Sequence, residues 1–110
     1  MSEPNYWNDK KVLVTGASGF LGLHLTKRLN ELDPLQLISP SHWTYDCLDL
    51  SEMQNLMTNY KPDVVIHCAG KCSGFKANQE DHSGFLWENL LMGMNVVKAS
   101  LIDGIKKLIL

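Results

Sequence analysis

The stretch Lys11-Val12-Leu13-Val14-Thr15-Gly16-Ala17-Ser18-Gly19-Phe20-Leu21-Gly22 decides the fold of this 110-residue chain. Its first five residues are rich in β-branched side chains, which predicts a short buried strand. From Gly19 onward apolar residues recur at helical spacing, at Phe20, Leu21, Leu25 and Leu29. This spacing predicts a helix that ends before Asp33-Pro34, because proline disfavours helical backbone in the residue before it.

The three glycines between this strand and this helix have separate tasks. Gly16 allows a tight turn, Gly19 lets a pyrophosphate approach bare backbone, and Gly22 lets the helix pack close to the strand. The helix N-terminus then offers free N–H groups and the positive end of a dipole to the phosphates. We therefore expect a dinucleotide-binding turn. A flexible Gly/Ser loop in an unrelated α/β protein is the alternative.

The rest of the chain alternates between strands and helices. Apolar runs predict strands at Leu35–Ile38, Asp63–Gly70 and Lys107–Leu110, with a poorer one near Thr44-Tyr45. Ser51-Glu52-Met53-Gln54 fits a capping box that opens a helix, and a longer helix runs from Phe85 to Leu101, closed by Gly104. This order predicts a Rossmann-type doubly wound parallel sheet of about five strands, in the order 3-2-1-4-5. Ligand would bind outside the carboxyl ends, between strands 1 and 4.

Composition narrows the functional classes. The net charge is −2, so no polycationic surface for nucleic acid is implied. No apolar run approaches the roughly 20 residues of a membrane helix, and the polar start Met1–Asn5 does not read as a signal peptide. The cysteines Cys47, Cys68 and Cys72 are odd in number, which suits a reducing compartment. We expect a cytoplasmic protein with neither nucleic acid nor membrane as partner.

The end of the second predicted strand bears on the choice of cofactor. An acid at this place usually binds the ribose 2′-OH of NAD, but here the strand ends in Ser39-Pro40-Ser41-His42. The missing carboxylate removes repulsion against a 2′-phosphate, and Ser41 and His42 could donate hydrogen bonds to one. NADP(H) is therefore favoured over NAD(H). The alternative that these are ordinary loop residues stays open.

Several motifs resemble one known family. The glycine turn, Asp46-Cys47-Leu48-Asp49 and Val65-Ile66-His67-Cys68-Ala69-Gly70 resemble the extended short-chain dehydrogenase/reductase family, the NAD-dependent epimerase/dehydratases of nucleotide sugars. Two further segments are similar to its GDP-L-fucose synthase branch: the loop Lys71–Asn78, similar to Gly-Gly-Ile-x-Ala-Asn, and the helix Phe85–Val97. Cys72-Ser73 departs from the Val-Gly of that branch.

The resemblance implies an NADPH-dependent 3,5-epimerase/4-reductase of GDP-4-keto-6-deoxy-mannose, an oxidoreductase and isomerase of GDP-fucose biosynthesis. Another nucleotide-sugar epimerase or dehydratase, or a non-catalytic NADP-binding or interaction module, is the alternative. Asn89 would lie in the active-site wall and Gly74 and Asn78 near the substrate. The implied cofactor-binding residues are Gly16, Ala17, Ser18, Gly19, Phe20, Leu21, Gly22, Pro40, Ser41, His42, Asp46, Cys47, Cys68, Ala69, Gly70, Lys71 and Asn89. For Asp46, a turn-capping role explains the spacing equally well.

The resemblance also implies what the chain lacks. The family's Ser/Thr and Tyr-x-x-x-Lys residues would follow Leu110, so we expect no catalytic residue here and an inactive N-terminal part of a single NAD(P)-binding domain, residues 1–110. A zinc set of His67, Cys68, Cys72 and His82 is disfavoured, because His67 and Cys68 would face opposite sides of a strand. In the family that the chain resembles, the long helix takes part in a homodimer, so the resemblance also implies a homodimer for the whole enzyme. The apolar last strand, left at an edge, would favour aggregation of this chain by itself.

Overall fold

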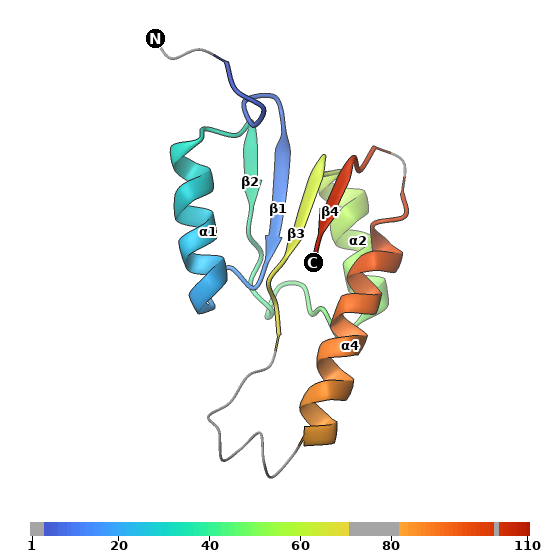
Figure 1. Ribbon diagram of the computed structural model, residues 1–110. Helices are drawn as coiled ribbons and strands as arrows, with labels where there is room; N and C mark the ends of the chain where they lie inside the picture. The colour runs from blue at the N-terminus through green and yellow to red at the C-terminus, as the bar shows by residue number, and fades with distance from the viewer. Residues whose placement is uncertain (1–3, 71–81, 103) are drawn as a thin grey trace.

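A computed structural model describes residues 4–70, 82–102 and 104–110. Within them, four parallel strands form one sheet in the order β2-β1-β3-β4. The strands are β1 (Lys11–Thr15), β2 (Gln36–Ile38), β3 (Val64–His67) and β4 (Lys107–Ile109), and the helices are α1 (Phe20–Glu31), α2 (Leu50–Tyr60) and α4 (His82–Ala99). Figure 1 shows α1 on one face of the sheet and α2 and α4 on the other. The predicted doubly wound α/β fold is confirmed.

The core is divided by the sheet into two halves, and β1 contributes to both. Leu13 packs in the half that contains Met53 and Leu56 of α2 and Val96 of α4. Val12 and Val14 belong to the other half, with Leu29 of α1. Because the strand is buried on both faces, its sequence is apolar at successive positions rather than at alternate ones.

The predicted strand near Thr44-Tyr45 is wrong. The backbone N–H groups of Thr44 and Tyr45 both donate to the carbonyl of Ser41, at 3.1 and 3.0 Å, and the hydroxyls of Ser41 and Thr44 lie 3.1 Å apart. These local hydrogen bonds close a turn where a strand would pair with β2. Short polar side chains offer the backbone this alternative to a sheet ladder. Within the described part of the sheet, β2 is therefore an edge strand.

Helix α2 begins earlier than the capping box predicts. Its N-cap is Asp49, whose carboxylate accepts from the amides of Ser51 and Glu52 at 3.0 and 3.2 Å. The Ser51 hydroxyl, assigned to the cap by the sequence pattern, instead donates to the same carboxylate at 2.7 Å. This hydroxyl, followed by the Glu52 amide, lowers the pKa of Asp49. A charged acceptor competes better for the free amides than a hydroxyl does.

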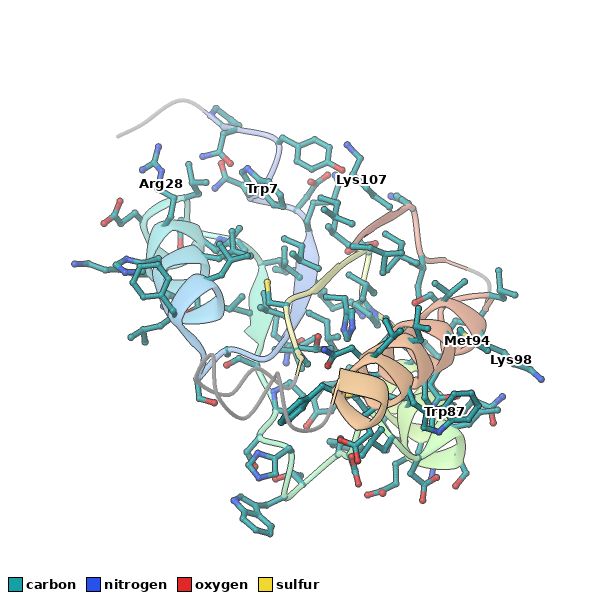
Figure 2. All side chains as sticks on the ribbon, turned by 60° about the horizontal axis from the view of Figure 1, so that its bottom comes forward. Trp7, Arg28, Trp87, Met94, Lys98 and Lys107 are labelled. Atoms are coloured by element: carbon teal, nitrogen blue, oxygen red, sulfur yellow. The ribbon has the colours of Figure 1, made fainter. Side chains whose placement is uncertain are left out.

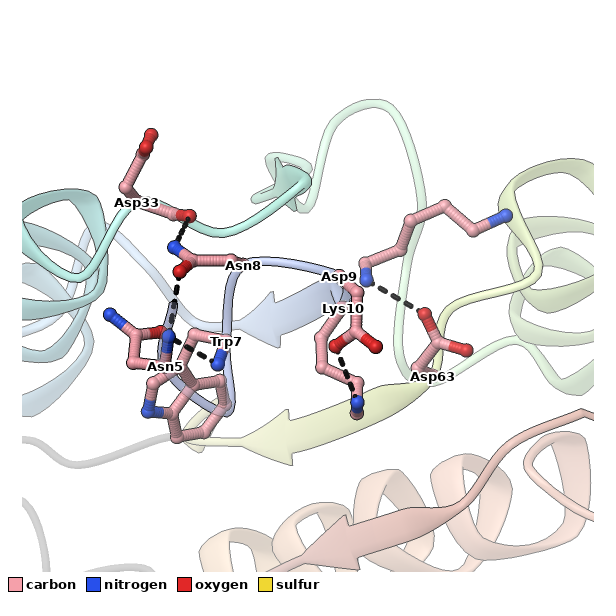
Figure 3. A network of polar contacts seen from close by, with 8 residues as sticks. Asn5, Trp7, Asn8, Asp9, Lys10, Asp33 and Asp63 are labelled. Carbon is pink, nitrogen blue, oxygen red and sulfur yellow. Dashed lines mark hydrogen bonds and ion pairs between the residues drawn. The ribbon is translucent and has the colours of Figure 1, made fainter. Parts of the chain in front are cut away.

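The amino ends of the strands are joined by side chains (Figure 3). Asp63, just before β3, accepts from the Lys11 amide at 2.8 Å through its carboxylate, and its carbonyl accepts from Lys106 and Lys107 ahead of β4. Asn8 donates to the carbonyl of Asp33 at 2.9 Å, which joins the segment before β1 to the end of α1. Three strands and one helix are thus tied together at this edge.

Candidate dinucleotide site

The glycine turn after β1 has the conformation that its sequence predicts. Gly16 has φ +73°, a left-handed backbone that side chains disfavour, and a Cβ there would lie 2.5 Å from the backbone nitrogen of Ala69. A Cβ on Gly22 would overlap the carbonyl oxygen of Gly16. Both glycines are therefore required by contacts within the protein, as expected for a tight turn and a closely packed helix.

Gly19 differs from the other two. Its backbone is extended, with φ −76° and ψ 173°, and a Cβ there would meet only the Gly16 carbonyl oxygen, at an ordinary 3.5 Å. Gly19 is also exposed. The described protein therefore leaves room for a side chain at Gly19, and the missing Cβ leaves bare backbone facing outward.

The N-terminus of α1 is open to an anion. Gly19 is its N-cap and provides no side-chain hydrogen bond, and the first turn contains no acid. The first hydrogen bond within the helix runs from the Leu23 amide to the Gly19 carbonyl, at 2.8 Å. The backbone amides of residues 20–22 therefore have no acceptor within the regular helical pattern. Such a terminus combines N–H donors with the positive end of the helix dipole.

A cavity of about 750 Å³ opens beside this turn, at the carboxyl ends of β1, β2 and β3. Most of the predicted cofactor residues line it: Gly16, Ala17, Ser18, Gly19, Pro40, Ser41, His42, Asp46, Cys47, Cys68, Ala69 and Gly70. Segments that are far apart in the sequence thus form one wall, as the switch-point rule for parallel sheets predicts.

Other predicted residues lie elsewhere. Phe20 and Leu21 point their side chains to solvent, and Gly22 is buried beneath the turn, so these three offer backbone at most. The amide oxygen of Asn89 on α4 lies 3.5 Å from where a Cβ of Gly70 would be, which places Asn89 beside the end of β3. Lys71, Gly74 and Asn78 fall outside the described residues.

The hydroxyl of Thr15 joins β1 to the end of β3. It accepts from the amides of Cys68 and Ala69, at 3.2 and 3.3 Å, and lies 2.6 Å from Nδ1 of His67. With two amides donating to it, the hydroxyl directs its own proton to His67, which requires an unprotonated Nδ1. Burial lowers the pKa of His67, in keeping with this neutral ring.

The loop after β2 is fixed against α4. The side-chain amide of Asn95 donates to the carbonyl of Cys47 at 2.9 Å, and this contact is buried. Burial, with the nearby Asp46 carboxylate, raises the pKa of the Cys47 thiol to about 11. Asp46 itself accepts from the Leu48 amide at 2.9 Å. The turn-capping role is therefore present, and the same carboxylate also lines the cavity.

Sequence reasoning missed several of the residues that line the cavity. Thr15, Trp43 and Met92 line it as well, and Asn95 supports the loop beneath. Thr15 could have been predicted from its place directly before Gly16. Trp43 could have been predicted because it is a large aromatic residue within a polar turn. Met92 and Asn95 come from α4, and their approach to the loop at Cys47 depends on tertiary packing. Among the described lining residues none is Lys or Arg.

One residue pair within the chain has the Tyr-x-x-x-Lys spacing that the resemblance places after Leu110. Tyr6 and Lys10 are four residues apart, and the Lys10 ammonium lies 4.6 Å from the centre of the Tyr6 ring. Both lie before β1, at the amino ends of the strands, whereas the cavity is at the carboxyl ends. Their spacing therefore places no catalytic pair at the cavity.

Two absences hold for the residues that the structure describes. No three His, Cys, Asp or Glu side chains there are grouped as metal ligands. The described helices include none with the length and apolar character needed to cross a membrane.

Comparison with known proteins points to one family. The profile of the NAD dependent epimerase/dehydratase family matches residues 12–110. GDP-L-colitose synthase of Yersinia pseudotuberculosis is 33% identical over 99 residues, 90% of this chain and 32% of that protein. The chain therefore spans about a third of the length of this curated relative.

Two solved structures share the architecture. The protein DdhaC superposes with a TM-score of 0.86 at 27% identity, covering 92% of this chain and 29% of DdhaC. A GDP-L-fucose synthetase from Naegleria fowleri bound to NADP superposes with a TM-score of 0.73 at 25% identity, covering 92% of this chain and 30% of that one. Together with the family profile, the glycine turn and the cavity beside it, these likenesses show that the chain belongs to the NAD dependent epimerase/dehydratase family.

Proposed function

We propose that this chain is the NADP(H)-binding part of a GDP-L-fucose synthase-like 3,5-epimerase/4-reductase of GDP-4-keto-6-deoxy-mannose. The observation that carries the proposal is Gly19, where the protein itself has room for a side chain but presents bare backbone at an uncapped helix N-terminus. A pyrophosphate at this terminus would be stabilised by hydrogen bonds from the amides that lie between Gly19 and Leu23 and by the helix dipole.

The preference for NADP(H) over NAD(H) is supported at the far end of the cavity. Ser39, Ser41 and His42 line it where β2 ends, and an acid is absent from that described stretch. Hydroxyl and imidazole groups can donate to a 2′-phosphate, whereas a carboxylate would repel it. Asp46 and Cys47 would contact the adenine.

The bound NADPH would supply a hydride to the keto carbon of the sugar. The residues of this chain hold the dinucleotide and shape the wall near Gly70 and Asn89, where the sugar nucleotide would approach. The proton for the reduced carbonyl is assigned, by resemblance alone, to a Tyr–Lys pair that the described residues do not provide at the cavity. We therefore expect no turnover from these 110 residues alone.

The proposed compartment and assembly follow the same resemblance. Cys47 and Cys68 are free thiols, which suits the reducing cytoplasm. The outward side of α4 carries the exposed apolar residues Leu86, Trp87, Leu90 and Met94, and Figure 2 shows Met94 and Lys98 directed away from the body of the molecule. This side is where a homodimer would form. In the isolated chain it and the exposed Leu110 would favour aggregation.

The proposal is tested by titrating the chain with NADPH while following nicotinamide fluorescence. We expect saturable binding to the wild type and its loss in Gly19→Val, because a branched side chain would occupy the path of the pyrophosphate. Gly93→Ala on α4 is the matched control, since nothing lies within 4 Å of a Cβ there. Unchanged affinity in Gly19→Val, with a native circular dichroism spectrum, would refute the site.

A reductase assay on GDP-4-keto-6-deoxy-mannose separates the two classes of function. Turnover by a polypeptide containing this chain supports the enzyme. NADPH binding without turnover in the longest natural polypeptide that contains it would favour the alternative, a non-catalytic NADP-binding module.

A further inference from the structure

The proposed function does not explain why Trp43 is exposed. Its side chain is 86% exposed, although an indole is among the largest apolar groups a protein can bury. It nevertheless lines the cavity, beside His42 and on the same wall as Asp46. An aromatic ring kept in water at the mouth of a ligand cavity lacks a partner of its own size within the described chain.

The turn that carries Trp43 is held without the help of its side chain. The Ser41 carbonyl accepts from the amides of Thr44 and Tyr45, at 3.1 and 3.0 Å, and the Ser41 and Thr44 hydroxyls lie 3.1 Å apart. The indole contacts the ring of His42, with 4.5 Å between ring centres and 39° between planes. The two rings are thus presented together on a locally closed turn.

The position of this ring pair fits one part of a dinucleotide. With the pyrophosphate on the Gly19 turn, the adenosine half extends toward the end of β2, where Ser41, His42 and Asp46 line the cavity. A purine has flat faces that stack on aromatic rings and polar edges that need hydrogen-bond partners. The Asp46 carboxylate supplies an acceptor, and Trp43 with His42 supplies flat surface.

We infer that Trp43 is the aromatic plate that packs against the adenine of the bound dinucleotide, with His42 supporting the indole. The inference rests on the proposed function and adds a binding residue to it. It also accounts for the exposure of Trp43, because the adenine ring would cover apolar surface that is otherwise in contact with water. Trp43 would then contribute affinity for the adenosine half of the cofactor and none for the nicotinamide half.

The test measures dissociation constants by isothermal titration calorimetry for NADPH, 2′,5′-ADP and nicotinamide mononucleotide. In Trp43→Ala we expect the Kd for NADPH and for 2′,5′-ADP to rise by about 5- to 100-fold, the range typical of one lost base–aromatic stack. Nicotinamide mononucleotide should bind with unchanged affinity. Trp43→Phe, which keeps a flat ring, should recover most of the lost affinity.

Trp87→Ala is the matched control, because Trp87 is also exposed but lies on α4, outside the cavity lining. Its removal should leave all three dissociation constants unchanged. Indole fluorescence gives a second readout: 2′,5′-ADP should quench it in the wild type and in Trp87→Phe, but not in Trp43→Phe.

The outcomes separate the two claims. If NADPH binds equally to wild type and to Trp43→Ala, the aromatic plate is wrong while the proposed function stands. If wild type binds no dinucleotide, both are wrong. If Trp43→Ala weakens the binding of nicotinamide mononucleotide as much as the binding of 2′,5′-ADP, the indole affects the whole site and the assignment to adenine is overturned. Because Trp43 is exposed, its variants should keep the wild-type circular dichroism spectrum.

Discussion

The two ends of the sheet are built by different means. At the amino ends, side chains add contacts to the backbone hydrogen bonds. The Asp63 carboxylate accepts from the Lys11 amide, Asn8 reaches the end of α1, and Lys10 and Lys107 lie 4.6 and 5.3 Å from the Tyr6 ring centre. At the carboxyl ends, bare backbone dominates, with Gly16 and Gly19 on one strand end and Gly70 on another. The first arrangement lies outside the cavity, whereas the second brings backbone with little or no side chain to the cavity wall.

The largest expected effect comes from a methyl group beneath the glycine turn. Gly22→Ala would place a Cβ on the Gly16 carbonyl, and we expect a loss of about 3 kcal/mol in unfolding free energy, at the upper end of the usual cost of overpacking. Urea denaturation followed by circular dichroism measures it. Gly19→Ala, which meets only an ordinary contact, is the matched variant and should keep its stability. Equal stability of the two variants would contradict the division between glycines needed by the fold and the one left for a ligand.

A smaller effect on the unfolding free energy is expected when one side-chain hydrogen bond is removed, either at the amino ends or at the carboxyl ends of the strands. Asp63→Ala removes the acceptor of the Lys11 amide, and Asn95→Ala removes the donor to the Cys47 carbonyl. Each should lower the unfolding free energy by about 1–3 kcal/mol, since a partly buried or buried backbone group loses its partner. Only Asn95→Ala should also weaken NADPH binding, because Cys47 belongs to the cavity loop. Weaker binding in Asp63→Ala would show that the two ends are coupled.

The smallest effect is a pH dependence at Thr15 and His67. Burial lowers the folded-state pKa of His67 below its unfolded value of 6.5. Above pH 6.5 the His67 ring is neutral in the folded and in the unfolded protein, so it does not lower the unfolding free energy. As the pH falls, the unfolded ring takes up a proton first, so stability declines toward the folded pKa. The melting temperature should therefore fall between about pH 7 and pH 5.

His67→Asn should flatten this decline, whereas His24→Asn, which changes an exposed ring on α1, is the control. An identical pH profile for His67→Asn and wild type would show that the ring does not carry the effect.

The sequence predicts well whatever depends on neighbours along the chain. The run before Gly16, the spacing of Leu25 and Leu29 in α1, and the order of crossovers follow from local periodicity and the handedness of parallel sheets. Prediction was wrong where two local structures compete for the same residues. Ser41 closes a turn instead of leading into an edge strand, and Asp49 displaces Ser51 as the cap of α2.

The candidate site also has one part that local sequence predicts and another that depends on tertiary packing. The half that we propose for phosphate lies on one continuous stretch with a recognisable pattern, from Gly16 to Gly19. The half that we propose for adenosine contains Trp43 and Cys47, and no periodicity predicts that Asn95 of α4 supports a loop 48 residues before it. Long-range contacts of this kind become visible only when the packing of α4 is known.

The central position of β1 has a consequence for the synthesis of the chain. Its partner β3 lies 52 residues further on, counted between the paired residues Val12 and Val64, so one long edge of β1 has no strand to pair with until that segment has been made. At a translation rate of about 5–20 residues per second, this takes roughly 3–10 seconds. During that interval an apolar strand with open backbone groups is exposed, which makes the nascent chain a substrate for chaperones and a source of misassembly. The close contact between Gly16 and the Ala69 backbone likewise forms only after that later segment has been made.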